Sequence, residues 1–118
     1  MICMYWITKN LGTAPKYELN DVKKLEDVEV VIAYDIRDGE GNTPLQIKRK
    51  VWKIAEIISK GKRAVIICKG GISRSNTIAL AYLVWNGKDF DEAYNLIRER
   101  VPIVQFNQNL LDLVKKLR

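Results

Sequence analysis

A run of β-branched residues, a glycine-rich loop and the start of a helix follow one another directly in residues 65–75. The apolar run of residues 65–67 ends at Cys68, and Gly70 and Gly71 stand in the loop that follows it. A strand, a loop and a helix N-terminus in this order turn several backbone N–H groups toward one point, which suits an anion. The stretch therefore predicts an anion site with a cysteine at its base.

The middle of the chain predicts a parallel pair of strands. Residues 28–34 and 64–67 are apolar, β-branched runs of the kind that fills buried central strands, and the helical pattern of residues 45–60 separates them. A strand–helix–strand unit places its two strands in parallel in one sheet. The polar, glycine-rich residues 35–44 then form a loop at a strand's carboxyl end, where open α/β sheets bind their ligands.

Three further helices are predicted after the second of these strands. Residues 77–85 are apolar on all sides, which indicates a helix in the centre of the molecule. Asp89 or Asp91 caps the next helix, which Pro102 ends, and Asn107 can cap a last one. We therefore predict an α/β fold with a small, mostly parallel central sheet flanked by helices.

The first part of the chain predicts shorter elements. Residues 3–7 are typical of a short strand, whereas residues 11–15 contain a glycine and a proline and are expected to be an irregular connection. Asn20 predicts the N-cap of a short helix that ends near Leu25. No repeat or linker interrupts the pattern, so residues 1–118 are expected to form a single domain.

The composition is that of an ordinary globular protein, with 47% hydrophobic and 29% charged residues. No run of about 18 apolar residues is present, so no membrane span is expected. Residues 1–6 lack the basic start and the cleavage site of a signal peptide. We therefore expect a cytoplasmic protein whose two cysteines are free thiols.

Histidine is absent from the whole chain. This absence excludes Ser-His-Asp and Cys-His catalysis, histidine-ligated zinc and any imidazole acid–base step. Two cysteines are also too few for a four-thiolate metal site. The chemistry therefore falls to Cys, Asp, Glu, Lys, Arg or Tyr, and we expect neither a metal nor a cofactor.

The chain carries a formal net charge of +6, which favours anionic partners in general. Its lysines and arginines are spread along the sequence rather than clustered, as in the solvated faces of amphipathic helices. The charge therefore does not single out nucleic acid as a partner. A phosphate or similar oxyanion in the glycine-rich loop is the partner that we expect.

Cys68 and Arg74 place a nucleophile and an oxyanion binder in one loop. A helix N-terminus and a nearby cation stabilise the thiolate form of a cysteine, which is its nucleophilic form. The planar guanidinium of Arg74 suits two oxygens of a phosphate group. Since the same few atoms would serve both groups, the loop indicates displacement at phosphorus rather than acyl transfer. The alternative is that Cys68 is a buried core cysteine at a strand end.

The loop resembles the signature of the protein tyrosine phosphatase superfamily, Cys-x-x-Gly-x-x-Arg followed by Ser or Thr. The corresponding residues here are Cys68-Lys69-Gly70-Gly71-Ile72-Ser73-Arg74-Ser75. Residues 81–83 and the stretch from Arg100 to Asn107 are similar to further patterns of the compact, archaeal-like dual-specificity phosphatases. The resemblance extends over residues 28–118, and it implies the three-layer sandwich of that superfamily.

The resemblance implies a two-step mechanism that needs no metal. Cys68 attacks phosphorus to form a phosphocysteine, while Arg74 and the loop amides hold the phosphoryl oxygens. Ser75 donates a hydrogen bond to the sulfur as it leaves, and the alternative is that Ser75 is only a helix cap. The residues expected to bind the substrate are those of the loop, namely Lys69, Gly70, Gly71, Ile72, Ser73 and Arg74.

An acid must protonate the departing oxygen, and the candidates stand in residues 35–44. Asp38 is followed by a glycine and later by a proline, which is similar to the Asp-Gly…Pro acid loop of compact family members, and we favour it. Asp35 is the second candidate, although it could instead end the strand and anchor the loop. Glu40 is the third, and the alternative for either aspartate is a turn residue.

Two positions depart from the family pattern. Ile67 stands where the family usually has a histidine before the nucleophile, and Val101 stands where many members have a second arginine. Activation of Cys68 must then come from the loop amides and from Arg74 alone.

The sequence thus predicts a phosphatase that acts on phosphotyrosine in protein substrates, with phosphoserine and phosphothreonine as further candidates. Hydrolysis of phosphoinositides or RNA 5′-phosphates is the alternative within the same fold, and the basic charge mildly favours it. A phosphate-binding module without turnover, a rhodanese and an arsenate reductase are the competing functions. The intact Cys68, Arg74 and Asp38 argue against the binding module, and the lack of an extra redox cysteine argues against the last two.

Overall fold

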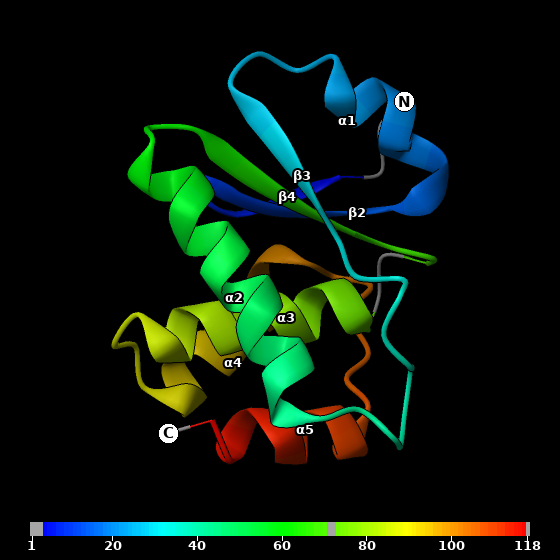
Figure 1. Ribbon diagram of the computed structural model, residues 1–118, viewed down its shortest axis with the longest axis vertical. Helices are drawn as coiled ribbons and strands as arrows, with labels where there is room; N and C mark the ends of the chain where they lie inside the picture. Colours follow the sequence, from blue (N-terminus) through cyan, green and yellow to red (C-terminus); the bar gives the residue numbers. More distant parts are fainter. Residues whose placement is uncertain (1–3, 71–72, 118) are drawn as a thin grey trace.

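The computed structural model describes residues 4–70 and 73–117, which form a four-stranded sheet between two layers of helices (Figure 1). The strands are β1 (Tyr5–Thr8), β2 (Leu11–Pro15), β3 (Val28–Ile32) and β4 (Arg63–Cys68). The helices are the 3₁₀ helix η1 (Lys16–Glu18) and the α-helices α1 (Leu19–Lys23), α2 (Pro44–Ser59), α3 (Arg74–Trp85), α4 (Phe90–Arg100) and α5 (Gln108–Lys115). Within these described residues, no helix is both long and apolar enough to span a bilayer.

The sheet has the strand order β1-β2-β4-β3. β2 and β3 each run parallel to β4, whereas β1 pairs antiparallel with β2. The pairing of β2 with β4 runs from Leu11 opposite Ala64 to Pro15 opposite Cys68, so these two strands end together at one edge of the sheet. The predicted α/β fold with a small, mostly parallel sheet flanked by helices is therefore confirmed, with β1 as an antiparallel addition.

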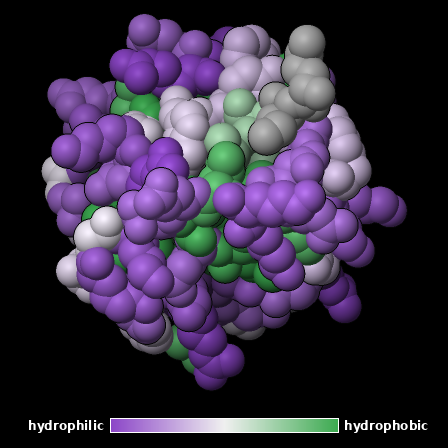
Figure 2. Space-filling model, turned by 90° about the horizontal axis from the view of Figure 1, so that it is seen from above, coloured by the Kyte–Doolittle hydropathy of each residue, from purple (hydrophilic) through white to green (hydrophobic). Residues whose placement is uncertain are grey.

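The side chains of β4 point alternately to the two faces of the sheet, and they contribute to two separate parts of the core. The side chains of Ala64 and Ile66 join the main cluster, to which helices α2–α5 contribute. Those of Val65 and Ile67 point the other way and join a smaller cluster with Val22 of α1. Seen from the α1 side, apolar residues occupy the middle of the surface and hydrophilic residues surround them (Figure 2). The main core therefore lies on the face opposite α1.

Helix α3 lies at the centre of the molecule, between the sheet and the other long helices (Figure 1). Its residues 75–84 are all buried, although the first three of them are polar. The prediction of a central helix at residues 77–85 is confirmed, and the helix begins earlier, at Arg74. The loop after β4 is therefore followed immediately by the most deeply packed helix of the fold.

The expectation of an irregular connection at residues 11–15 is wrong, because these residues form β2, which is buried along its whole length. A Cβ at Gly12 would lie 2.9 Å from the Trp6 ring on the neighbouring strand, so glycine is what lets the two pack together. Pro15 stands at the end of the strand, where a missing N–H interrupts the ladder least. Gly12 and Pro15, which are typical of loops, are therefore compatible with a buried strand in this fold. The Trp6 side chain is what requires the glycine.

The expectation that residues 28–34 form a buried central strand is wrong. The run forms β3, which lies at the edge of the sheet and ends at Ile32. Helices α1 and α2 both contact the strand, and four of its five residues are only partly buried. The residues of β3 are therefore mostly apolar because helices pack on both faces of the strand, and not because it has a neighbouring strand on each side.

The expectation that Asn20 caps a helix is also wrong. Asn20 lies inside α1, because the 3₁₀ turn η1 leads directly into that helix at Leu19. Glu18 occupies the N-cap position and makes no capping hydrogen bond through its side chain. The predicted short helix exists, but a 3₁₀ turn leads directly into it. No side chain caps the helix, so the sequence contains no capping signal at its true start.

Three of the longer helices begin at polar caps, and the caps of α4 and α5 were predicted. Thr43 and Gln46 form a reciprocal capping box at the start of α2. Asp89 accepts two backbone N–H bonds at the start of α4, and Asn107 accepts one at the start of α5. The choice between Asp89 and Asp91 is thereby resolved in favour of Asp89.

Candidate active site

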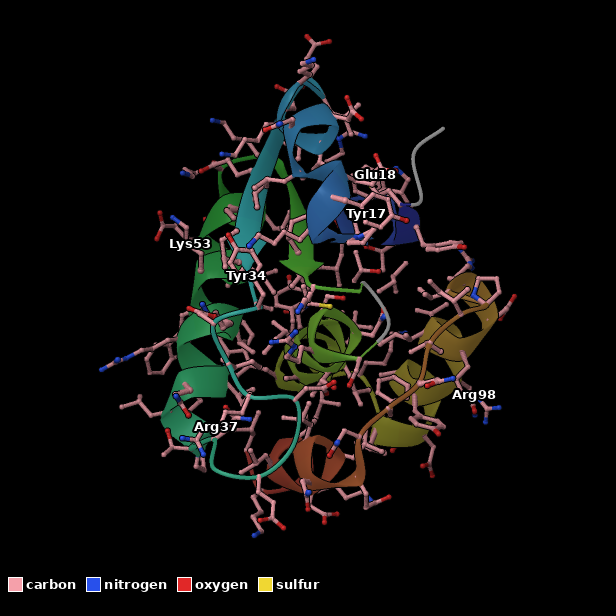
Figure 3. All side chains as sticks on the ribbon, turned by 90° about the vertical axis from the view of Figure 1, so that its right-hand side faces the viewer. Tyr17, Glu18, Tyr34, Arg37, Lys53 and Arg98 are labelled. Atoms are coloured by element: carbon pink, nitrogen blue, oxygen red, sulfur yellow. The ribbon has the colours of Figure 1, made fainter. Side chains whose placement is uncertain are left out.

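The loops that follow β4 and β3 meet at the carboxyl edge of the sheet. The two strands run parallel, so their carboxyl ends lie side by side. We call residues 69–73 the β4–α3 loop and residues 33–43 the β3–α2 loop. Figure 3 shows Tyr34 where β3 leads into the second loop and Arg37 farther along it. The arrangement brings the predicted cysteine loop and the predicted acid loop together.

Cys68 is the last residue of β4, and its side chain is almost fully buried, with 2% of its surface exposed. Its Sγ lies 3.2 Å from Oγ of Ser75, which stands in the first turn of α3 and is fully buried. The sequence brings the two together because the strand ends and the helix begins on either side of one short loop. A hydroxyl that can donate to a thiolate is thus already beside the sulfur.

The other residues predicted for this loop differ in their surroundings. Lys69 and Gly70 are exposed, whereas Ser73 is buried, with 8% of its surface exposed. Gly71 and Ile72, which are also predicted to bind the substrate, lie outside the described residues.

Arg74 connects the two loops. One of its guanidinium nitrogens, Nη1, donates to the carbonyl oxygens of Tyr34 at 3.0 Å and Ile36 at 2.9 Å. Both carbonyls belong to the β3–α2 loop, so the orientation of the guanidinium is set by backbone rather than by a carboxylate. The guanidinium keeps its positive charge uncompensated by an ion pair among the described residues, as an oxyanion binder requires.

Asp38 lies against the β4–α3 loop. Its Oδ1 accepts a hydrogen bond from Oγ of Ser73 at 2.8 Å, and its backbone oxygen accepts one from Nδ2 of Asn107 at 3.5 Å. A hollow of about 150 Å³ is lined by Asp38 and Ser73 together with residues 105–107. The favoured acid candidate is thus an exposed carboxylate held next to the residue that precedes Arg74.

The two other acid candidates lie elsewhere. Asp35 forms an ion pair with Lys50 of α2, with 2.8 Å between Oδ2 and Nζ. Glu40 lines a separate hollow with residues of α5, among them Asn109 and Asp112. Of the three carboxylates, Asp38 is the one that hydrogen bonds to the β4–α3 loop in the part of the chain that the structure describes.

Buried polar groups support the β4–α3 loop from behind. Oγ1 of Thr13 on β2 donates to Oδ1 of Asn76 at 3.2 Å, and Oγ1 of Thr77 donates to the backbone oxygen of Ser73 at 3.0 Å. Sequence reasoning missed these contacts. The signal that could have indicated them is the run of three polar residues that begins an otherwise apolar helix.

Both departures from the family pattern are core residues. Ile67 is fully buried in the smaller cluster with Val65 and Val22. Val101 is fully buried in the main cluster, at the end of α4. At both positions, an apolar side chain that packs in the core stands where the family pattern has a polar one.

Aromatic and basic side chains lie on the same side of the molecule as the two loops. Figure 3 shows Tyr17 and Tyr34 on this side, and Tyr17 is 72% exposed. The ammonium group of Lys16 lies 4.5 Å from the centre of the Tyr34 ring. Across residues 4–70 and 73–117, no group of three acidic or thiol side chains is placed to hold a metal ion.

Comparisons with known proteins indicate the same family as the sequence motif. The model of the family described as "Dual specificity phosphatase, catalytic domain" matches residues 7–117. The human dual specificity protein phosphatase 8 is 39% identical over 64 residues, which cover 50% of this chain and 10% of that protein. The chain therefore corresponds in length to a small part of that relative.

Solved structures of similar shape cover the chain almost completely. Tk-PTP in its active form has a TM-score of 0.83 at 23% identity, and the match covers 98% of this chain and 95% of that one. A mouse putative dual specificity phosphatase complexed with zinc tungstate has a TM-score of 0.87 at 14% identity, over 99% of this chain and 87% of that one. At these identities the two structures establish the fold.

Proposed function

We propose that this chain, which belongs to the family of dual specificity phosphatase catalytic domains, hydrolyses phosphate monoesters on proteins. The proposed substrate is phosphotyrosine, with phosphoserine and phosphothreonine as further substrates. The observation that supports it most is the pair formed by the buried Cys68 thiol, beside Ser75, and the Arg74 guanidinium, oriented by two carbonyls. A thiol and an oriented guanidinium in one loop are suited to attack on a bound phosphoryl group.

In the first step, Sγ of Cys68 attacks phosphorus in line with the bond to the leaving oxygen. The S–P bond forms as the P–O bond breaks, and Asp38 transfers its proton to the departing oxygen. Arg74 and the loop amides stabilise the charge on the phosphoryl oxygens that do not react. The products are a phosphocysteine and the free hydroxyl of the dephosphorylated residue.

In the second step, Asp38 takes a proton from a water molecule that attacks the phosphocysteine. The S–P bond breaks, inorganic phosphate leaves, and the sulfur departs as a thiolate that receives a hydrogen bond from Ser75. The 3.2 Å separation of Sγ and Oγ supports this last role, since a hydroxyl at that distance can donate to the developing charge. Asp38 ends the cycle protonated and ready for the next substrate.

Rapid-quench mass spectrometry during turnover of para-nitrophenyl phosphate tests the mechanism directly. We expect a covalent phosphoryl group on Cys68 and a burst of nitrophenol equal to the enzyme concentration when the second step is slower than the first. Cys68→Ser is the control and should give neither signal. Full turnover by Cys68→Ser would refute the proposed nucleophile.

The substrate class is tested with a panel at equal concentration. Matched peptides that carry phosphotyrosine, phosphoserine or phosphothreonine stand beside a phosphoinositide and an RNA 5′-triphosphate, and phosphate release is measured for each. We expect the highest kcat/KM for phosphotyrosine. Binding of tungstate without turnover of any of these compounds would instead identify a non-catalytic phosphate-binding module.

A further inference from the structure

A third hollow lies between the edge strand β3 and helix α2, outside the proposed catalytic site. Its volume is about 500 Å³, which is within the range of about 300–1,000 Å³ found for ligand pockets. Strand residues 30–32 form one wall, and the basic side chains of Arg49, Lys50 and Lys53 line the α2 side. We call this hollow the β3–α2 groove.

The backbone of β3 is open toward solvent on one side. The N–H of Ala33 donates to the oxygen of Ile67 at 2.7 Å, and the oxygen of Asp27 accepts from the N–H of Arg63 at the same distance, so odd-numbered residues face β4. Because β3 is an edge strand, the alternate backbone groups point away from the sheet. These are the N–H and C=O groups of Val28, Val30 and Ile32.

The side chains along the groove leave a net positive charge. Lys50 is neutralised by its ion pair with Asp35, at 2.8 Å. Arg49 and Lys53 are both exposed, and neither forms an ion pair with any described residue. Figure 3 shows Lys53 on the side of the molecule formed by α2 and β3. An occupant with carboxylates would therefore complement this wall.

We propose that the β3–α2 groove binds an extended, acidic peptide segment of a protein partner. The segment adds to β3 as a further strand, bonds to the open backbone groups, and places carboxylates against Arg49 and Lys53. An open backbone edge recognises an extended chain, and the basic wall selects an acidic one. The proposal goes beyond the proposed phosphatase activity and does not depend on it.

The groove also shares residues with the β3–α2 loop of the candidate site. The chain after β3 supplies the carbonyl oxygens of Tyr34 and Ile36, which accept hydrogen bonds from Arg74. Asp35 and Ile36 of the same stretch line the groove. A partner segment bound along β3 would thus contact the loop that orients the guanidinium.

The test uses the full chain, labelled with ¹⁵N, and a capped peptide of alternating glutamate and valine. We expect the peptide to shift the amide resonances of Val30 and Ile32 and to lose affinity as salt is added. A peptide with glutamine in place of glutamate should bind more weakly. A peptide with the same side chains but alternate backbone nitrogens methylated should also bind more weakly, since it cannot complete the strand.

Two charge-reversal variants complete the test. Arg49→Glu with Lys53→Glu should weaken binding of the glutamate peptide by about tenfold. Lys9→Glu with Arg98→Glu makes the same change in net charge, and Figure 3 shows Arg98 on the opposite side of the molecule from Lys53, so binding should be retained. Val30→Pro removes one outward N–H from an edge position and should weaken binding while the fold is kept.

Three outcomes would overturn the proposal. Shifts confined to the β4–α3 loop would show that the peptide is only attracted to the candidate phosphate site. Equal affinity for the methylated peptide would show that no strand is added. A concentration-dependent dimer in sedimentation, disrupted by Val30→Pro and unaffected by the peptide, would show that β3 instead pairs with a second copy of the chain.

Discussion

The two loops at the carboxyl edge of the sheet are held in different ways. The β4–α3 loop runs from a buried strand end to a helix whose residues 75–84 are all buried, and Thr13, Asn76 and Thr77 support it from within the core. The β3–α2 loop is longer and mostly exposed, and it contacts the first loop through Ser73 with Asp38 and through Arg74 with two carbonyls. The proposed nucleophile is thus fixed by the core, whereas the proposed acid is positioned by a few polar contacts at the surface.

This difference predicts how sensitive each loop is to substitution. A group fixed by the core has no substitute when it is removed, while a group at the surface is exposed to solvent that can partly replace it. Removal of Cys68 or Arg74, which stand at the two ends of the β4–α3 loop, should therefore lower activity far more than removal of a side chain from the β3–α2 loop. Four substitutions test this contrast, and they follow in order of decreasing expected effect.

Cys68→Ser should lower kcat/KM for para-nitrophenyl phosphate by at least about 10⁴-fold, because a hydroxyl without an adjacent base is a poor nucleophile at neutral pH. Steady-state kinetics measures the loss, and circular dichroism checks that the fold is kept. Tungstate binding by this variant should persist. A loss of less than about tenfold would mean that Cys68 does not supply the reacting atom.

Arg74→Lys should lower kcat/KM by about 10³-fold, even though the positive charge is kept. Lysine can neither bind two phosphoryl oxygens side by side nor reproduce the two bonds from Nη1 to the β3–α2 loop. Kinetics with the same substrate measures the effect. Activity near that of the wild type would show that charge alone is sufficient and that the link between the loops is dispensable.

Asp38→Asn should lower kcat by about 10²-fold for phenyl phosphate, whose leaving group needs a proton, and much less for para-nitrophenyl phosphate. The matched control is Asp35→Asn, which removes a carboxylate from the same loop and should leave kcat within about twofold, since a surface ion pair contributes little. Reversal of this order between the two variants would reassign the acid to Asp35.

Ser73→Ala should lower kcat by about fivefold, the equivalent of one ordinary hydrogen bond. The variant removes the bond to Oδ1 of Asp38 and leaves the carboxylate in place. In the double variant with Asp38→Asn, the second substitution should add almost nothing to the first. Fully additive effects would mean that Ser73 does not act through Asp38.

The same contrast explains how far sequence reasoning could go. The β4–α3 loop is a local feature: an apolar run, two glycines and an apolar helix stand next to each other, so the end of β4 and the start of a central helix were predictable. The long-range features were not. β2 was missed because the reason for its glycine is Trp6 on β1 and its partner β4 lies far away in the sequence.

The acid candidates show the same limit. Asp35, Asp38 and Glu40 are close in sequence and equally able to carry a proton, and motif similarity favoured Asp38. Their different contacts, with Lys50, with Ser73 and with the hollow beside α5, depend on how an irregular loop turns in space. The carbonyls that hold Arg74 are backbone atoms, which no side-chain pattern can indicate.

The burial of residues 75–84 of α3 determines how the protein is expected to lose activity. Because residues 75–84 of this helix are all buried, we expect their amides to exchange with deuterium only when the whole domain opens. Its first turn holds Ser75 and borders the β4–α3 loop. The candidate nucleophile site should therefore remain intact for as long as the domain is folded, and a core substitution far from it should reduce the amount of active protein while leaving kcat per folded molecule unchanged.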